Sequence, residues 1–364
     1  MRFESVNFSC EQCGATLIYS PVTNSLSCEF CSSTEAIPLS NNTIEEYDFY
    51  KTLQSLGTHK IEETTKEVKC SKCAVTFELS PYVVSSSCPY CGTPAITDFV
   101  KDITPKSILP FTITEIMAIE KFKKWIGSLW FAPSKLKKIA NGENKLKGYY
   151  LPHWTYDSQT YSKYSGERGT IYYVTVEKTV IENGRERQVQ EREARIRWTP
   201  VSGAISNSFN DVTVGASKTI SHSILESLEP WDTTKLVPFN KKYLSGFESE
   251  EYTIGLKSGF KFAKIKMDIV IRRDIIADIG GDQQRIHHVN TKHSNTTYKN
   301  ALFPVWIAKF NWKNKIYNYA INGQSGEVRG ERPYSIIKIV LLVGVILTLI
   351  GVAFYFKDGF MVSH

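Results

Sequence analysis

The sequence predicts an α+β protein with two small metal-binding modules before its main domain and one membrane helix after it. Three observations lead to this fold class. All eight cysteines lie in the first quarter of the 364 residues, strand-like alternation surrounds an Asn-Gly turn, and an uncharged apolar run lies near the C-terminus. With 42% hydrophobic and 22% charged residues, most of the chain has enough apolar side chains to form a core.

Two sets of cysteines have the spacing of four-thiolate zinc sites. In each set, fourteen residues separate two C-x-x-C pairs, so two tight turns on a hairpin can share one ion. The first set is Cys10, Cys13, Cys28 and Cys31, and the second is Cys70, Cys73, Cys88 and Cys91. Disulfides are the alternative, but residues 1–10 lack an apolar leader, and a cytosol keeps thiols reduced. We therefore expect two Zn²⁺ ions per chain.

The two cysteine sets belong to an internal repeat. Adding sixty to each cysteine number of the first set gives a cysteine of the second, and Thr16 and Thr76 agree in the same way. Residues 15–19 and 75–79 read as short strands that lead into Ser-Pro turns. Each repeat is therefore predicted to be a zinc ribbon with almost no core of its own, so that zinc supplies its folding free energy.

Helical periodicity appears at three places in the soluble part. Thr114 is suited to cap a helix over residues 115–129, and a second long helix is expected over residues 257–279, where Gly280-Gly281 ends it. A short helical segment is expected in the linker between the ribbons, where apolar residues recur at helical spacing from residue 44 to residue 56.

The remainder of the soluble part reads as antiparallel β-structure. Residues 172–181 and 188–198 alternate on either side of Asn183-Gly184, the strongest short hairpin signal. Residues 303–310, 315–321 and the segment from Glu327 onwards form a predicted meander. The expected divisions are ribbon 1 at 1–36, a helical linker at 37–65, ribbon 2 at 66–98, an α+β domain at 104–334, a transmembrane helix at 336–356 and a tail at 357–364.

A second, shorter internal similarity suggests that the α+β domain consists of two related halves. Leu151-Pro152-His153-Trp154 resembles Phe303-Pro304-Val305-Trp306, and Ser165-Gly166-Glu167-Arg168-Gly169 resembles Ser325-Gly326-Glu327-Val328-Arg329-Gly330. Each half would be a helix followed by a Pro-x-Trp strand and a Ser-Gly turn.

Residues 339–356 contain no charge and are long enough to cross a bilayer as a helix. Lys338 and Lys357 bracket the run, and more Arg and Lys precede it than follow it. The positive-inside rule therefore predicts a single-pass protein of the inner membrane whose N-terminal bulk is cytoplasmic. Gly344, Thr348 and Gly351 fall on one helix face, where small residues allow a partner helix to approach.

Catalytic signatures do not appear in the sequence. It contains no G-x-x-x-x-G-K-[ST], H-E-x-x-H or G-x-S-x-G motif. His287, His288 and His293 do not have the spacing of a metal site and are expected to be polar strand or loop residues. We therefore expect no catalytic residues, no bound organic cofactor and no enzymatic activity.

Charge is distributed unevenly along the chain, whose overall excess is +7. Residues 1–35 carry one Arg and four Glu, residues 66–97 carry three Lys and two Glu, and residues 119–147 carry eight Lys and two Glu. A ribbon that grips DNA should be basic, because phosphate neutralisation supplies most of the affinity. These ribbons are not basic, and the lysine-rich stretch is expected to be a solvated helix face or a contact with anionic headgroups or an acidic partner.

The chain resembles the bacterial membrane-anchored double zinc-ribbon proteins that are often labelled primosomal protein N′, superfamily II helicase-like or transcription factor IIB-type. Besides the cysteine pairs, the resemblance rests on Trp130-Phe131-Ala132-Pro133, Tyr149-Tyr150-Leu151-Pro152-His153-Trp154, Tyr164-Ser165-Gly166-Glu167-Arg168-Gly169, Leu228-Glu229-Pro230-Trp231-Asp232, Arg272-Arg273-Asp274, Asp278-Ile279-Gly280-Gly281-Asp282-Gln283-Gln284-Arg285 and Asn322-Gly323-Gln324-Ser325-Gly326-Glu327-Val328. It implies a ribbon like that of a replication-restart helicase, without the ATP-binding motifs.

The same resemblance implies a membrane adaptor. Relatives of this kind are associated with flotillin-like (SPFH) and phage-shock-type envelope-stress proteins, which would be the cytosolic partners. The expected function is thus a non-catalytic, zinc-stabilised, tail-anchored scaffold that recruits proteins. The alternative is a zinc-ribbon protein that binds nucleic acid while tethered to the membrane.

Residues 357–364 are predicted to lie across the membrane from residues 1–338. In intact cells, a membrane-impermeant thiol reagent with access to the outer face of the inner membrane should modify a Ser363→Cys variant. A cysteine placed beside Gly184 should be protected, because it lies on the cytoplasmic side. Labelling beside Gly184 with protection at position 363 would reverse the topology.

Overall fold

The computed structural model describes residues 2–38, 43–55, 65–99, 104–133, 146–182, 185–218, 220–313 and 315–361. The helices are α1 (Phe49–Ser55), α2 (Glu115–Ser128), α4 (His222–Ser227), α5 (Leu256–Ile279) and α6 (Ile336–Met361), with short 3₁₀ helices η1 (Thr233–Lys235) and η2 (Lys241–Leu244). Strands contribute more of the described structure than helices do, as the predicted α+β class requires.

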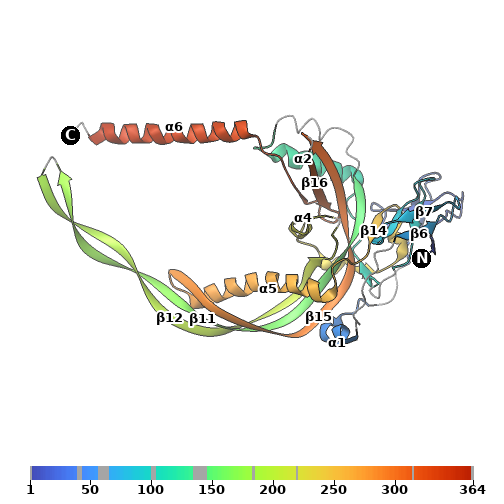
Figure 1. Ribbon diagram of the computed structural model, residues 1–364, viewed down its shortest axis with the longest axis horizontal. Coiled ribbons are helices and arrows are strands. Elements are labelled where there is room, and N and C mark those ends of the chain that lie inside the picture. The colour runs from blue at the N-terminus through green and yellow to red at the C-terminus, as the bar shows by residue number, and fades with distance from the viewer. Residues whose placement is uncertain are drawn as a thin grey trace.

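Three very long strands form the frame of the molecule. They are β11 (Lys147–Glu182), β12 (Arg185–Gly215) and β15 (Gln283–Trp312). β11 lies in the middle and pairs in antiparallel fashion with both of the others, so the three strands form one arc (Figure 1). The remaining strands are β1 (Arg2–Glu4), β2 (Leu17–Ser20), β3 (Ser25–Cys28), β4 (Thr34–Ala36), β5 (Tyr47–Asp48), β6 (Lys66–Lys69), β7 (Thr76–Leu79), β8 (Val83–Ser87), β9 (Pro94–Ile96), β10 (Ser107–Ile108), β13 (Val237–Pro238), β14 (Glu248–Glu250), β16 (Lys315–Asn322) and β17 (Val328–Gly330).

Helix α5 lies along the inner side of this arc (Figure 1). Its buried residues recur every three or four positions and therefore form one apolar stripe: Leu256, Gly259, Phe260, Ala263, Met267, Ile271, Ile275 and Ile279. Gly259 lets the helix approach the strands, because a Cβ there would collide with Tyr156 and Trp154. The helix ends where the sequence predicts, at Gly280 with φ of 65°.

A second core lies between α2 and the other end of the sheet. Thr114 caps α2 as predicted, because its side chain accepts a hydrogen bond from the backbone N–H of Met117. The ring of Phe122 stacks on Tyr319 of β16 at 3.8 Å between centroids. On the neighbouring strand, the indole of Trp306 donates to the carbonyl of Ile113 at 2.8 Å.

The predicted hairpin is present and is longer than the sequence indicates. Its strands pair from His153↔Gly215 as far as Glu182↔Arg185, far beyond residues 172–198. The tip of the hairpin is exposed on both faces, covered and exposed positions alternate nearer the core, and both faces are covered only at residues 150–158 and 213–215. The turn residues Asn183 and Gly184 lie outside the described residues.

The linker between the ribbons is helical over fewer residues than predicted. Only Phe49–Ser55 forms a helix, and Tyr47–Asp48 is a strand that pairs with Thr297 and Tyr298 of β15. Tyr47 packs against Tyr298 at 5.8 Å between ring centroids. The apolar residues of the linker have helix-like spacing, but its residues 47–48 pair with the edge of β15 and are therefore extended. Residues 39–42 and 56–64 lie outside the described residues.

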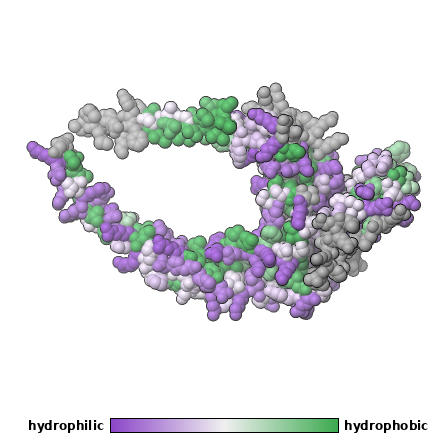
Figure 2. All heavy atoms as spheres, in the orientation of Figure 1, coloured by the Kyte–Doolittle hydropathy of each residue, from purple (hydrophilic) through white to green (hydrophobic). Residues whose placement is uncertain are grey.

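Helix α6 leaves the folded body as a separate element (Figure 1). It is long and apolar enough to cross a membrane, and none of the window Ile336–Ala353 is buried within the chain. Figure 2 shows apolar side chains along the first part of α6, in contrast to the largely polar surface of the arc. Its first turn is fixed to the loop after α2, where Lys338 donates to the carbonyls of Trp130 and Ala132 at 3.1 and 2.8 Å.

Mild acid should destabilise the folded chain through His153. This ring is buried on β11, stacks on Phe303 at 4.3 Å and lies 3.0 Å through Nδ1 from the carbonyl of Leu151. Burial, with the positive field of Lys266, lowers the pKa of His153 from 6.5 to about 3. Below pH 6.5 the unfolded chain therefore binds a proton that the folded chain excludes, and the free energy of unfolding falls.

The expected loss is about 2 kcal/mol between neutral pH and about pH 5. Urea titrations of the protein in detergent at the two pH values measure it. His153→Gln stays neutral throughout and should show a smaller change with pH than the wild type. An equal change in both proteins would contradict the assignment to His153.

Candidate metal centres

Each of the four C-x-x-C segments forms the same tight turn. The carbonyls of Cys10, Cys28, Cys70 and Cys88 each accept a hydrogen bond from the N–H four residues later, at 2.8–3.0 Å. The residue after each second cysteine has a positive φ: Gly14 (70°), Ser32 (60°), Ala74 (59°) and Gly92 (72°). Glycine adopts this conformation without strain, and each set therefore has one favourable and one less favourable turn. Turns of this shape direct two sulfurs toward one point.

The sulfurs in each set converge as a metal site requires. Within each set the four ligand atoms lie within 4.8 Å of one another, and these sets are the cysteine groups predicted from the sequence. The Cys10–Cys31 and Cys13–Cys28 sulfurs are 3.6 and 3.5 Å apart, and those of Cys70–Cys91 and Cys73–Cys88 are 3.7 and 3.9 Å apart. Tetrahedral zinc with Zn–S bonds of about 2.3 Å places its sulfurs roughly 3.8 Å apart. Each cluster therefore has the dimensions to hold one tetrahedral zinc ion.

The electrostatics of the free thiols also favour a cation. The hydroxyl of Ser33 lies 3.0 Å from the Cys10 sulfur and lowers the pKa of that thiol to about 6. In the second set Thr93, sixty residues later, lies 3.4 Å from Cys91 and lowers its pKa to about 6. The backbone at Ala15 favours the thiolate of Cys13, but desolvation and the neighbouring thiols outweigh it and raise its pKa to about 12. Four thiolates so close together need a divalent cation to share them.

The first ribbon is not an independent module. Its sheet β2–β3–β4 contributes Leu17, Tyr19 and Leu26 to the same core as Tyr150 and Trp306 of the long strands. Tyr19 donates its N–H to the carbonyl of Ser245 at 2.9 Å, and the Ser245 hydroxyl donates to the carbonyl of Leu17 at 2.7 Å. Cys10 and Cys28 belong to this shared core. Metal binding at the first set therefore stabilises residues of the main domain.

The second ribbon joins the main sheet directly. Its strands β8 and β9 extend the large sheet through β14, with Ser249 opposite Ser85. Its other strands, β6 and β7, pair with each other, and β6 also pairs with β1 at the start of the chain, so the two ribbons are interleaved. Lys66 and Glu251 form a buried ion pair at 2.5 Å across this junction. Breaking one partner of such a pair costs several kcal/mol, about 3–5.

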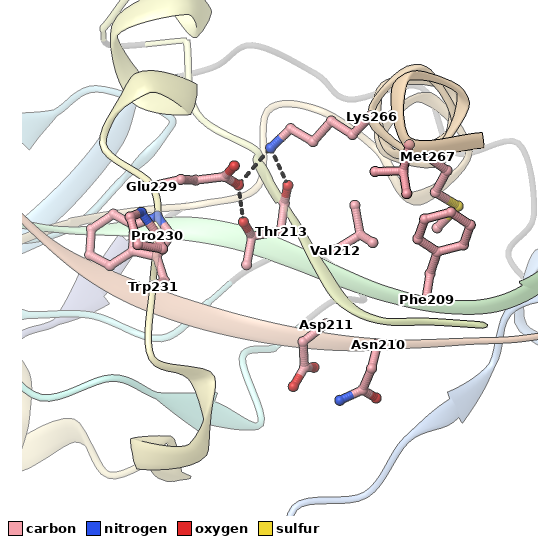
Figure 3. A pocket seen from close by; sticks show the side chains of 11 residues that line it. Phe209, Asn210, Asp211, Val212, Thr213, Glu229, Pro230, Trp231, Lys266 and Met267 are labelled. Atoms are coloured by element: carbon pink, nitrogen blue, oxygen red, sulfur yellow. Dashed lines mark hydrogen bonds and ion pairs between the residues drawn. The ribbon is translucent and has the colours of Figure 1, made fainter. Parts of the chain in front are cut away.

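A shallow pocket of about 320 Å³ lies where α5 faces the segment after α4 (Figure 3). Lys266 is held there by Glu226 and Glu229, the latter at 2.6 Å, and donates to the carbonyl of Thr213 at 2.6 Å. The apolar wall comes from Phe209, Val212, Trp231, Met267 and Val270. Because two carboxylates already neutralise Lys266, its charge serves mainly to join α5 to β12 and to the loop after α4.

The other charged groups singled out in the sequence are distributed along the arc. His287 and His288 are both exposed on β15, at an irregularity in its pairing with β11, and His293 lies farther along the same strand. Arg272 pairs with Asp268 at 2.6 Å, one turn away on α5. Asp278 accepts a hydrogen bond from Tyr164 at 2.5 Å. In the lysine-rich stretch, Lys121, Lys123 and Lys124 are exposed on α2, whereas residues 134–145 lie outside the described residues.

Two features could not be found by reading the sequence alone. The buried pair Lys66–Glu251 joins residues 185 positions apart, and no local pattern relates them. The pocket around Lys266 draws on β12, the segment 229–231 and α5. The one local signal was Leu228-Glu229-Pro230-Trp231-Asp232, which supplies Glu229 and Trp231 to the pocket.

Zinc analysis of the purified chain should give two ions, one for each cluster. A Cys70→Ser/Cys73→Ser variant should retain one ion and lose stability in the main sheet as well, because β8 is part of it. Lys72→Gln changes the same turn without removing a ligand and should keep both ions. A ratio near zero in the wild type, or an unchanged ratio in the double variant, would contradict the metal centres.

Comparison with known proteins reveals a similarity that is not confined to the cysteine-containing segments. No family model matches the chain, and no solved structure matches it. The chain is similar to the uncharacterized protein YdjG of Bacillus subtilis (strain 168), with 25% identity over 343 residues. The similar region covers 91% of each chain, and it therefore spans far more than the cysteine-containing segments.

Proposed function

We propose that this protein is a zinc-stabilised adaptor of the inner membrane that recruits cytosolic protein partners. The observation that carries the proposal is the combination of two four-cysteine clusters, joined to the main domain, with an apolar helix of which no part of the window Ile336–Ala353 is buried. Thiolate clusters need a reducing compartment, whereas an apolar helix needs a bilayer. Both needs are met by a chain that is anchored in a membrane and has its bulk in the cytosol.

The surroundings of the first turn of α6 support membrane contact. The side chain of Trp130 is 76% exposed and that of Tyr334 58% exposed, close to the point where Lys338 binds the loop after α2. Exposed tryptophan and tyrosine beside a basic residue are typical of the interface between headgroups and acyl chains. The aromatic side chains would hold the folded body against the cytoplasmic surface.

Anchoring places one requirement on the shape of the molecule. The far end of the hairpin extends in the same general direction as α6 (Figure 1). Its two strands carry many charged side chains, including Arg185, Arg192 and Glu193, and charged side chains are excluded from the bilayer core. In an anchored chain the tip of the hairpin must therefore lie outside the hydrocarbon core.

The surface left for partners is large and composed of rigid elements. The arc exposes Tyr161, Tyr173 and Ile181 on its strands, and the outer side of α5 exposes Ile265 and Ile269. Cytosolic proteins of the flotillin-like or phage-shock type, which the sequence resemblance implies, are the proposed partners. The small-residue face of Gly344, Thr348 and Gly351 is the proposed contact for a helix within the membrane. At both glycines a Cβ would meet no atom of the described chain within 4 Å.

The proposal that the α+β domain consists of two related halves gains support from a reciprocal contact. The indole of Trp154 donates to the carbonyl of Ile254, the second residue before α5, whereas that of Trp306 donates to the carbonyl of Ile113, the second residue before α2. Each Pro-x-Trp strand thus fixes the start of the helix in the other half. Leu151 and Phe303, at corresponding positions, also pair with each other.

Proximity labelling in living cells tests the adaptor function. A biotin ligase fused to the N-terminus should label a small set of cytosolic proteins, and a variant lacking residues 336–364 should lose the labels that depend on the membrane. Labelling no richer than that of the ligase alone would contradict the proposal. Tight binding of DNA that weakens with salt would favour the nucleic-acid alternative.

A further inference from the structure

The far end of the hairpin exposes a strand edge with an unusual charge pattern. Within the residues that the structure describes, β12 pairs only with β11, so its other edge has no strand beside it. Residues 185–195 are all exposed. In an antiparallel strand the N–H and C=O groups point alternately to the two sides. Half of those on residues 185–193 therefore point away from β11 and can accept a further strand.

The nine residues 185–193 read Arg-Glu-Arg-Gln-Val-Gln-Glu-Arg-Glu. Their charges are antisymmetric about Val189: each position before it has an opposite charge, or a matching glutamine, at the same distance after it. Antiparallel pairing of two such segments about Val189 would place Arg185 opposite Glu193, Glu186 opposite Arg192 and Arg187 opposite Glu191. Because the pairing has two-fold symmetry, six opposite-charge pairs result and no like-charge pair.

Other ways of pairing the same segments are penalised. A parallel, in-register pair would place every charge opposite its own kind. Sliding the antiparallel pair by one residue in either direction brings glutamate opposite glutamate and arginine opposite arginine. Charged edges commonly prevent strands from associating. Here the charges disfavour the parallel pairing and both one-residue shifts, and they favour the antiparallel pairing centred on Val189.

The side-chain contacts within one chain are compatible with this pairing. Glu191 pairs with Lys178 at 3.0 Å and Glu193 with Arg195 at 3.1 Å, and all four side chains are at least half exposed. Each carboxylate has two oxygens and can contact a second cation from another chain. A nine-residue pairing would be about 30 Å long, within the usual range for strands in sheets.

We propose that two copies of this chain associate through the outer edges of β12, in antiparallel register centred on Val189, so that two hairpins form one four-stranded ribbon. Backbone hydrogen bonds supply the attraction and the alternating charges fix the register. The association is independent of zinc and of other partners, and it extends the adaptor function by bringing two chains together.

Reciprocal charge reversal tests the register in the full-length protein in detergent micelles. Arg185→Glu/Arg187→Glu and Glu191→Arg/Glu193→Arg each turn four opposite-charge pairs into like-charge pairs. Each variant alone should dimerise about tenfold more weakly than the wild type, or more weakly still, by light scattering at several concentrations. Mixed with each other, the two variants should form a heterodimer, because every pair across the interface is then complementary.

The variant with all four substitutions is the matched control for folding. It contains every change that the other two contain, yet it restores opposite charges across a homodimer and should dimerise like the wild type. Zinc content and urea midpoints should be similar in all variants. A monomeric wild type, dimerisation that none of the substitutions alters, or a monomeric four-substitution variant would overturn the proposal. So would dimerisation that is lost only with Gly344→Leu, which would place it in α6.

A cross-linking measurement tests the centre of the pairing. Val189→Cys should form a disulfide-linked dimer under mild oxidation, because residues opposite each other on the axis lie about 4.5–5.5 Å apart between Cα atoms. Gln188→Cys and Gln190→Cys should cross-link poorly alone and efficiently when mixed, since residue 188 faces residue 190. Equal cross-linking of all three single variants would contradict this register.

Discussion

The antiparallel pairing of β11 with β15 is the interaction on which the rest of the structure depends. It runs from Lys147 opposite Ile307 to Gly169 opposite Gln283 and joins segments far apart in the sequence. On its inner side it holds α5, and at one end it supports α2 through Trp306 and Tyr319. β12 pairs with the other edge of β11, and β16 pairs with the other edge of β15 and leads through β17 to α6. Changes that separate these two strands would therefore disturb nearly every other element.

The two cysteine ribbons illustrate how small modules gain stability from a larger one. The first has no separate core, the second has only a small cluster around Val68, Phe77 and Leu79, and in each the conformation of the C-x-x-C turns depends on two residues with positive φ. The first ribbon adds Leu17 and Tyr19 to the core of the main domain, and the second adds β8 to its sheet. A metal bound by these cysteines would therefore stabilise residues that the main domain also stabilises, so its loss would weaken the sheet.

The part of α6 beyond its first turn and the outer edge of β12 both lack a neighbour in the described chain, and these two surfaces differ in kind. Helix α6 exposes apolar side chains on all sides, which water disfavours and a bilayer accepts. The outer edge of β12 exposes backbone groups among alternating charges, which water accepts but another strand can pair. The first favours a membrane and the second a copy of the same chain. Together they account for a molecule whose longest elements extend away from its core.

The sequence by itself determined the features that depend on neighbours along the chain. The cysteine spacing located both clusters, the uncharged run located α6, and Thr114 and Gly280 marked ends of α2 and α5, because ligand turns, hydropathy and caps are local. Only the tertiary structure decided that β5 would be a strand, that the first ribbon shares the main core while the second joins the main sheet, and that the hairpin pairs from His153 to Glu182. These outcomes depend on which distant segment supplies the hydrogen bonds and apolar contacts, and no local pattern encodes that choice.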